Sequence, residues 1–149
     1  MPDTSARACV FCKIMQGELP ASFVHRGDRV AAFMDIQPVT PGHTLVIPLA
    51  HAPYLSDLEP DDGAEMFRVG QRVALALAEL AERGHIRCEG VNFFLANGQA
   101  AGQEVFHAHL HVFPRFEGDG FGLRLPPDYA QLPPREELDR LAEAITRAL

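Results

Sequence analysis

Short blocks of apolar residues, separated by glycine and proline, run along most of this chain. Apolar runs at 30–35 and 43–48 flank a turn that contains two prolines and a glycine, which predicts a pair of antiparallel strands. Two more apolar runs, at 91–96 and 106–113, predict further strands, and the segment 97–104 between them predicts a loop because it carries two glycines. The loop leads directly into the last of these strands.

Helical periodicity predicts two helices. From about 61 to 83, apolar residues recur mostly every three or four positions, and Gly84 follows as a helix stop. Pro133 and Pro134 open a C-terminal helix. The apolar positions of that helix fall on one face, and they are Leu138, Leu141, Ala142, Ile145 and Leu149. A few strands beside one long helix favour an α+β fold.

The size of the chain favours a single domain. It has 149 residues and no internal repeat or linker, so we expect one domain over 1–149 in which 116–149 is a C-terminal extension. No stretch approaches the roughly 20 apolar residues of a membrane span, and the first residues lack the layout of a signal peptide. These features predict a cytoplasmic protein that has no membrane partner.

Charge further limits the partners. The formal net charge at pH 7 is −7, which repels DNA, RNA and anionic membranes. We therefore expect no nucleic-acid partner. A ligand that carries phosphate would have to be held by local groups.

Three histidines alternate with apolar residues in the last predicted strand. Side chains in a strand point alternately to its two faces, so His107, His109 and His111 are expected to share one face. The apolar residues between them would then pack on the other face and fix the backbone. Three imidazoles side by side add little packing and repel one another when charged. The trio therefore indicates either metal ligation or catalysis.

Two of the three cysteines are close in sequence. Cys9 and Cys12 have the spacing that lets two sulfurs meet one metal ion, but such a pair is half of a tetrahedral site. A redox role would need a thioredoxin-like βαβ pattern around them, which the sequence lacks. Cys88 has no visible partner and is interpreted as a spare thiol.

The segment His107-Ala-His-Leu-His-Val-Phe113 resembles the motif of the histidine triad (HIT) family, in a bacterial, Hint-like branch with an N-terminal Cys-x-x-Cys. Further segments resemble that branch in the same order, and they are 9–14, 17–21, 33–38, 41–48 and 101–107. The resemblance implies a HIT-like fold, with an antiparallel five-stranded sheet, one long helix and a C-terminal helix. It also implies a homodimer that pairs the main helix and a sheet edge of two copies.

The resemblance implies a nucleotide hydrolase. Such enzymes cleave a nucleoside α-phosphate from its leaving group through a nucleotide covalently attached to the middle histidine, which is His109 here. Neutral imidazole is a good nucleophile near pH 7. His111 and His43 are expected to assist at the phosphate oxygens or the leaving group. The substrate is expected to be a purine nucleotide: an adenosine phosphoramidate, an adenylate or a dinucleoside polyphosphate.

The same resemblance implies a nucleotide-binding set. Backbone N–H groups of the loop before the triad are expected to hold the α-phosphate, and Asp35 the ribose hydroxyls. The loop residues of this set are Asn97, Gly102, Gln103, Glu104 and Val105, and the apolar walls around the base are Phe11, Phe33 and Ile36. Relatives often carry serine in place of Glu104, and a carboxylate there would oppose a phosphate.

A zinc site is also implied by the resemblance. In relatives with this Cys-x-x-Cys, the two remaining ligands correspond to His51 and His107, which gives a closed Cys2His2 site together with Cys9 and Cys12. Such a site would hold a structural Zn²⁺. No organic cofactor is expected.

Two other functions remain open at this point. One is a non-catalytic purine-nucleotide-binding or sensor module with the same fold. The other is a metal-dependent hydrolase that uses the three histidines as ligands. The third triad histidine, His111, argues against the transferase branch, which usually carries glutamine there, and favours hydrolysis by water.

Overall fold

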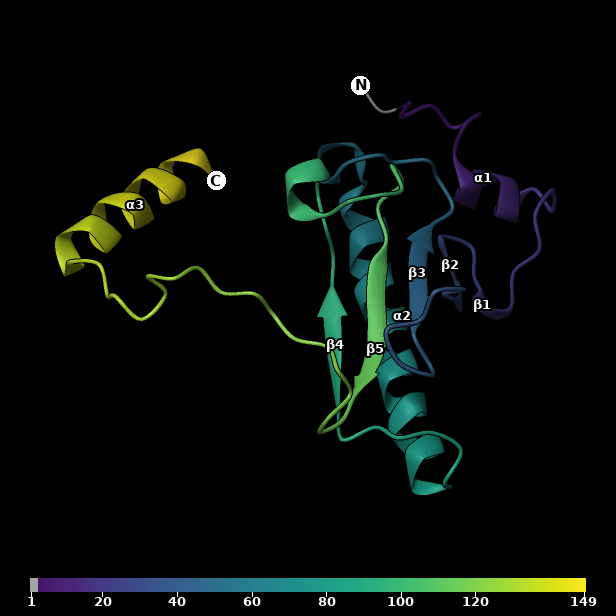
Figure 1. The fold of residues 1–149 in the computed structure, drawn as a ribbon. Coiled ribbons are helices and arrows are strands. Elements are labelled where there is room, and N and C mark those ends of the chain that lie inside the picture. Colours follow the sequence, from purple (N-terminus) through teal and green to yellow (C-terminus); the bar gives the residue numbers. More distant parts are fainter. Residues whose placement is uncertain (1–2) are drawn as a thin grey trace. The chain divides into compact units, whose positions relative to one another are not determined.

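An antiparallel sheet forms the centre of the first part of the chain (Figure 1). The computed structural model describes residues 3–149, which divide into two compact units, one ending at Asp119 and one formed by Gly120–Leu149. The first unit carries five strands in the order β1-β2-β3-β5-β4, and their bounds are Phe23–Arg26 for β1, Val30–Met34 for β2, Thr44–Pro48 for β3, Gly90–Phe94 for β4 and Leu110–Arg115 for β5. The five-stranded antiparallel sheet predicted from the sequence is confirmed.

Helices accompany the sheet. Those of the first unit are α1 (Val10–Met15), α2 (Pro60–Glu82) and two short 3-10 helices, Leu55–Asp57 and Gln99–Ala101. The long helix expected from about 61 to 83 is therefore present as α2. In the second unit, α3 spans Arg135–Ala148 and matches the predicted C-terminal helix.

The two faces of the sheet are covered by different helices. The face toward α2 buries Val30, Ala32, Val46, Leu110 and Val112 against Met66, Val69 and Leu77. The opposite face buries Ala31, Phe33, Leu45 and Ile47 against α1, with Phe11, Cys12 and Ile14. Because β2 and β3 are covered on both sides, they are almost continuously apolar and do not alternate.

The structure differs from the sequence prediction at three elements. The sequence pattern predicts no element at α1 or at β1. The last strand starts at Leu110 and not at 106, because the backbone N–H of Ala108 donates to the carbonyl of Ala52 in a loop, and ladder pairing with β3 and β4 begins at 110 and 111. Only His111 of the three histidines therefore lies within the strand.

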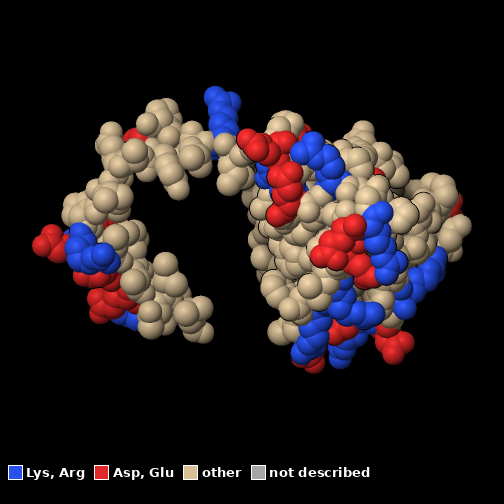
Figure 2. Space-filling view, turned by 90° about the horizontal axis from the view of Figure 1, so that it is seen from below, with Lys and Arg blue, Asp and Glu red and all other residues tan. Residues whose placement is uncertain are grey.

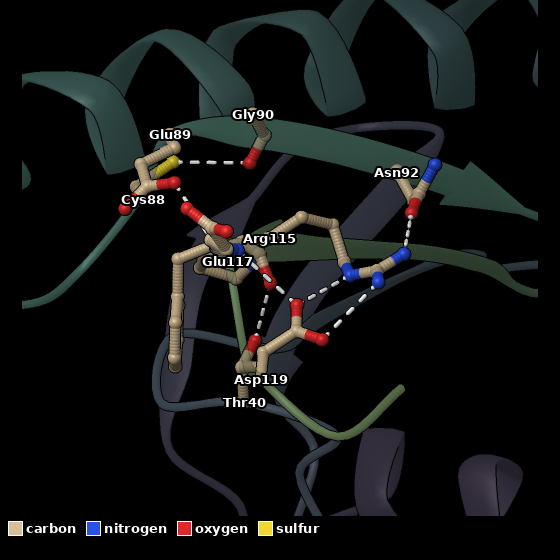
Figure 3. A network of polar contacts seen from close by, with 10 residues as sticks. Thr40, Cys88, Glu89, Gly90, Asn92, Arg115, Glu117 and Asp119 are labelled. Carbon is tan, nitrogen blue, oxygen red and sulfur yellow. Dashed lines mark hydrogen bonds and ion pairs between the residues drawn. The ribbon is translucent and has the colours of Figure 1, made fainter. Parts of the chain in front are cut away.

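A network of polar contacts, here called the clasp, joins Glu89, Asn92, Arg115, Glu117 and Asp119 at the end of β5 (Figure 3). The Arg115 guanidinium donates to the Asp119 carboxylate from Nε at 2.6 Å and from Nη2 at 3.1 Å, and its Nη1 donates to Asn92 of β4 at 2.6 Å. The Glu89 carboxylate accepts from the backbone N–H of Glu117 at 3.0 Å. The clasp fastens the segment after β5 to β4.

The second unit is a helix preceded by an irregular segment. Its helix α3 has no buried residue, and Leu138, Leu141 and Ile145 are exposed. That residues 116–149 form an extension of a single domain stays a prediction.

Surface charge is mixed in sign. On the face of the first unit seen in Figure 2, acidic and basic side chains lie next to one another. Several acidic and basic side chains of the first unit form ion pairs, such as Arg29 with Asp62. Within residues 3–149, no helix is both long and apolar enough to cross a membrane.

Gly42 gives a test of the turn before β3. Its φ is +105°, and a Cβ there would lie 2.9 Å from Leu77 Cδ2 and 3.0 Å from Pro114 Cγ. Gly84 has a φ of +77° and open space around it, so Gly84→Ala is the matched control for backbone strain alone. In urea unfolding we expect Gly42→Ala to lower the free energy of unfolding by about 3 kcal/mol and Gly84→Ala by about 1 kcal/mol. Equal losses would contradict the close packing at this turn.

Candidate functional site

Three histidines meet on the side of the sheet that faces α1, and a fourth lies beside them. His111 lies in β5 opposite Leu45, and His109 comes two residues earlier, with its ring centroid 4.8 Å from that of His111. His43 precedes β3, and its ring lies 5.1 Å from that of His111. The ring of His107 is fully buried and belongs to a neighbouring cluster with the cysteines.

A chain of hydrogen bonds fixes the tautomers of two of these histidines. The backbone N–H of Val39 donates to Nδ1 of His43 at 3.0 Å, so the proton of neutral His43 must lie on Nε2. That Nε2 lies 2.9 Å from Nδ1 of His111 and donates to it. His111 therefore carries its own proton on Nε2, where it is available to a ligand.

His109 has the opposite arrangement. Its Nδ1 lies 2.7 Å from the backbone oxygen of His107. A carbonyl oxygen only accepts, so Nδ1 of His109 carries the proton and Nε2 keeps its lone pair. His109 thus presents a nucleophilic nitrogen beside the N–H group of His111.

Burial keeps these rings neutral. It is the main cause that lowers the pKa of His43, His109 and His111, and for His111 the value falls to about 4 with help from the neighbouring histidines. Asp35 acts in the other direction, since its carboxylate lies 3.6 Å from Nε2 of His43. Among the described charged groups that act on these histidines, no Lys or Arg occurs.

The loop before the triad is held by its own polar side chains. Gln103 is buried, accepts from the N–H of Gly98 and donates to the carbonyls of Pro53 and Val105. Its side chain is therefore occupied in shaping the loop, and its backbone N–H donates to the carbonyl of Gly98 at 3.1 Å. Gly102 adopts a φ of +88°, which favours glycine.

The other predicted nucleotide-binding residues lie in different surroundings. Asn97 accepts from the backbone N–H of Leu55, and Glu104 is exposed. Phe11 and Phe33 are buried and meet edge to face at 5.5 Å, with Val105 packed against the same apolar cluster. Asp35 accepts from the N–H of Gln37 at 2.8 Å, and Ile36 is 92% exposed. Of the apolar walls expected around a base, two are thus core residues and one is at the surface.

Two cysteines and two histidines form a second cluster beside the triad. They are Cys9, Cys12, His51 and His107, and their possible ligand atoms lie within 4.8 Å of one another. The Cys12 sulfur lies 3.3 Å from Nδ1 of His51 and 3.6 Å from Nδ1 of His107, the Cys9 sulfur lies 3.4 Å from Nδ1 of His107, and the two Nδ1 atoms are 3.3 Å apart. A tetrahedral zinc would separate sulfur from nitrogen by about 3.5 Å and nitrogen from nitrogen by about 3.3 Å. The cluster therefore has the dimensions of a four-coordinate site.

The protonation of the two histidines in this cluster also favours metal binding. Nε2 of His51 lies 2.8 Å from the carbonyl of Thr4, and Nε2 of His107 lies 2.8 Å from that of Pro48. Both Nε2 atoms must donate, so both Nδ1 atoms present lone pairs to each other, an arrangement that a shared cation stabilises. Burial and the neighbouring Cys9 raise the pKa of the Cys12 thiol to about 11, so thiolates here need a nearby cation.

A family comparison agrees with this geometry. The sequence model of the HIT domain matches residues 16–118, which is more than half of the chain. The chain belongs to the HIT family. The resemblance seen in the triad motif is thereby confirmed, and the presence of Cys9 and Cys12 is consistent with the Cys-x-x-Cys branch.

Solved structures extend the comparison over nearly the whole HIT protein. A HIT family protein from Bacillus anthracis has a TM-score of 0.84 at 38% identity, covering 97% of this chain and 99% of that one. A histidine triad nucleotide-binding protein from Candida albicans has a TM-score of 0.81 at 30% identity, covering 95% and 96%. A zinc-bound histidine triad family protein from Mycobacterium smegmatis has a TM-score of 0.71 at 40% identity, covering 94% and 99%.

Sequence reasoning missed the groups that orient the imidazoles. They are the N–H of Val39 and the carbonyl of His107, both on the backbone, so no side-chain motif marks them. The edge-to-face contact of Phe11 with His109, at 5.2 Å, was also not foreseen.

Acid should destabilise this HIT protein through its buried histidines. The pKa of His111 is about 4 in the folded chain against an ordinary value of 6.5, so the unfolded chain binds more protons between these limits and stability falls as the pH drops from 6.5 to 4. One such group accounts for at most about 3 to 4 kcal/mol. We expect His111→Asn to flatten the fall in free energy of unfolding, measured with urea between pH 8 and 5. Parallel curves for variant and wild type would count against a neutral, buried His111.

Proposed function

We propose that this HIT protein is a nucleotide hydrolase that separates a nucleoside α-phosphate from its leaving group through a nucleotide covalently attached to His109. The observation that carries the proposal is the pair of opposite tautomers. His109 offers a lone pair at Nε2, and the adjacent His111 offers a proton at Nε2. A nucleophile and a donor side by side suit the displacement of a leaving group at phosphorus.

The proposed reaction has two steps. In the first, Nε2 of His109 forms a bond to the α-phosphorus, and the bond from phosphorus to the leaving group breaks. The leaving group takes the electron pair of that bond and accepts a hydrogen bond from Nε2–H of His111. The carbonyl of His107 accepts from Nδ1–H of His109 and stabilises the positive charge that the ring then carries. In the second step a water molecule adds to phosphorus, the bond to His109 breaks, and the proton from water passes to the leaving group.

Nucleotide binding is assigned by proximity to this centre. We assign the α-phosphate to backbone N–H groups of the loop that contains Gly102 and Glu104, and the ribose to Asp35, whose carboxylate faces His43. Phe11 and Phe33 would border the base from the core, and Ile36 from the surface. The name of the Candida albicans protein supports a nucleotide ligand for this fold.

Two alternatives are weaker. A metal-dependent hydrolase would need lone pairs from all three triad histidines, but His43 donates from Nε2 to Nδ1 of His111 and so leaves the proton of His111 on its other nitrogen. A non-catalytic nucleotide-binding module would explain the fold and the loop. Such a module would have no need for His109 to carry its proton on Nδ1 while His111 carries its proton on Nε2.

We further propose that Cys9, Cys12, His51 and His107 hold a structural zinc ion. When bound, zinc would supply a closed, four-coordinate cross-link and no open position for water. The separations of the donor atoms and the carbonyl partners of both histidines support this assignment, as does the zinc-bound relative from Mycobacterium smegmatis.

A two-fold homodimer completes the proposal. Phe67 and Leu75 on the outer face of α2 are 61% and 67% exposed, and Phe94 on the edge strand β4 is 41% exposed. Exposed apolar side chains on a helix and a neighbouring sheet edge are suited to pairing with a second copy.

Replacing His109 tests the covalent mechanism. We expect wild-type protein mixed with an adenylated amine or diadenosine polyphosphate to gain the mass of one adenylate, and His109→Ala to gain none while still binding AMP. Loss of the nucleophile should lower kcat by about 10⁴ or more. His85→Ala, which removes an exposed histidine outside the cluster, is the matched control. An adduct on His109→Ala would refute the mechanism.

Replacing His51 tests the zinc site. The variant His51→Ala should carry much less than the roughly one zinc per chain expected of the wild type, because a ligand is lost. Its thermal midpoint should fall, and chelation of the wild type should reproduce that fall. Zinc content by elemental analysis and thermal unfolding would be compared with His85→Ala. Equal zinc in both variants would exclude His51 as a ligand.

A further inference from the structure

Phe11 occupies an unusual place in the chain, between the two cysteines of the metal cluster. Cys9 caps the N-terminus of α1, where its sulfur accepts from the N–H of Cys12 at 3.4 Å. Phe11 projects from this short helix into the core and is 6% exposed. Any group that fixes Cys9 and Cys12 therefore also fixes the ring of Phe11.

That ring touches the nucleophile. The ring centroid of Phe11 lies 5.2 Å from that of His109 at an interplanar angle of 81°, and 5.9 Å from that of His107 at 74°. Both contacts are edge to face, which is the favoured geometry for aromatic pairs. The orientation of the His109 ring thus depends on where α1 holds Phe11.

His109 is also held from its other side. Its Nδ1–H donates to the carbonyl of His107, and the ring of His107 is fixed by its bond to Pro48 and by its place among the metal-site donors. Two separate paths therefore lead from the cluster to the nucleophile. One runs through α1 and the ring of Phe11, the other through the backbone of His107.

We infer that Phe11 is a positioning residue for His109, and that the cysteine and histidine cluster sets the orientation of the nucleophile through Phe11 and the carbonyl of His107. The inference rests on the proposed role of His109 in catalysis. It gives the cluster a part in the reaction beyond stabilising the fold, and it gives Phe11 a part beyond bordering a base. A nucleophile that loses its near-attack geometry reacts more slowly even when the substrate still binds.

The kinetic test compares Phe11→Leu with Phe23→Leu in the full-length, zinc-loaded protein. Phe23 packs edge to face on Phe33 at 5.7 Å, and Phe33 in turn packs on Phe11, so replacing Phe23 removes an aromatic ring of the same apolar cluster at a greater remove from His109. We expect Phe11→Leu to lower kcat about five- to tenfold, beyond any change in the Kd for AMP that comes from its place beside the base, and Phe23→Leu to leave kcat unchanged. If Phe11 only borders the base, Kd rises and kcat is unchanged, and the inference fails.

A spectroscopic test separates this inference from the proposed function. In histidine-selective ¹⁵N spectra, wild-type His109 should be a single tautomer with its proton on Nδ1, whereas Phe11→Leu and the chelated wild type should show averaging of the two tautomers. Phe11→Met serves if Phe11→Leu does not fold. An unchanged His109 signal in these samples overturns the inference, whether or not the protein hydrolyses nucleotides. If the wild type does not hydrolyse nucleotides, but Phe11→Leu and the chelated wild type do show averaged tautomers of His109, the proposed function is overturned and the positioning of His109 by Phe11 stands.

Discussion

The hydrogen bond between Nε2 of His107 and the carbonyl of Pro48 holds the residue that contacts both the cysteine and histidine cluster and His109. It joins the segment before β5 to the end of β3, at a ring that is fully buried. By taking up the proton on Nε2, it leaves Nδ1 free to face the cysteines. The same residue offers its backbone oxygen to His109. The ring and the backbone carbonyl of His107 thus connect the sheet, the donor cluster and His109, the proposed nucleophile.

Backbone groups also determine which ring nitrogen carries the proton in the histidines of the proposed catalytic centre. A neutral histidine carries its proton on one of two distinct ring nitrogens, and the choice depends on the partner of the other nitrogen. Here the N–H of Val39 selects the tautomer of His43, which in turn selects that of His111, while the carbonyl of His107 selects the opposite tautomer for His109. Because main-chain groups cannot titrate, this arrangement is stable near neutral pH.

Much of the fold could be predicted from the sequence where the pattern is long or bounded by turns. The runs at 30–35 and 43–48 and the periodic stretch from 61 to 83 became β2, β3 and α2. Short elements were missed, since α1 has six residues and β1 has four, too few to show a period. The start of β5 depends on the contact of Ala108 with Ala52, which is far away in sequence.

The candidate site could likewise be predicted in part from the sequence. Side-chain types at fixed spacing pointed to the triad and to the cysteine pair, and the structure brings those residues together. What the sequence could not show were the backbone partners and the use of Gln103 within its own loop, because these depend on the folded path of the chain.

The double use of His107 has a consequence for how such proteins diverge. The ring serves the donor cluster, whereas the carbonyl serves His109, and every residue type has a carbonyl. A lineage that loses its cysteines therefore keeps an acceptor for His109, but it loses the proposed positioning of that ring by the cluster. Under this proposal the cross-link and the chemistry change together, because both meet at one position of the chain.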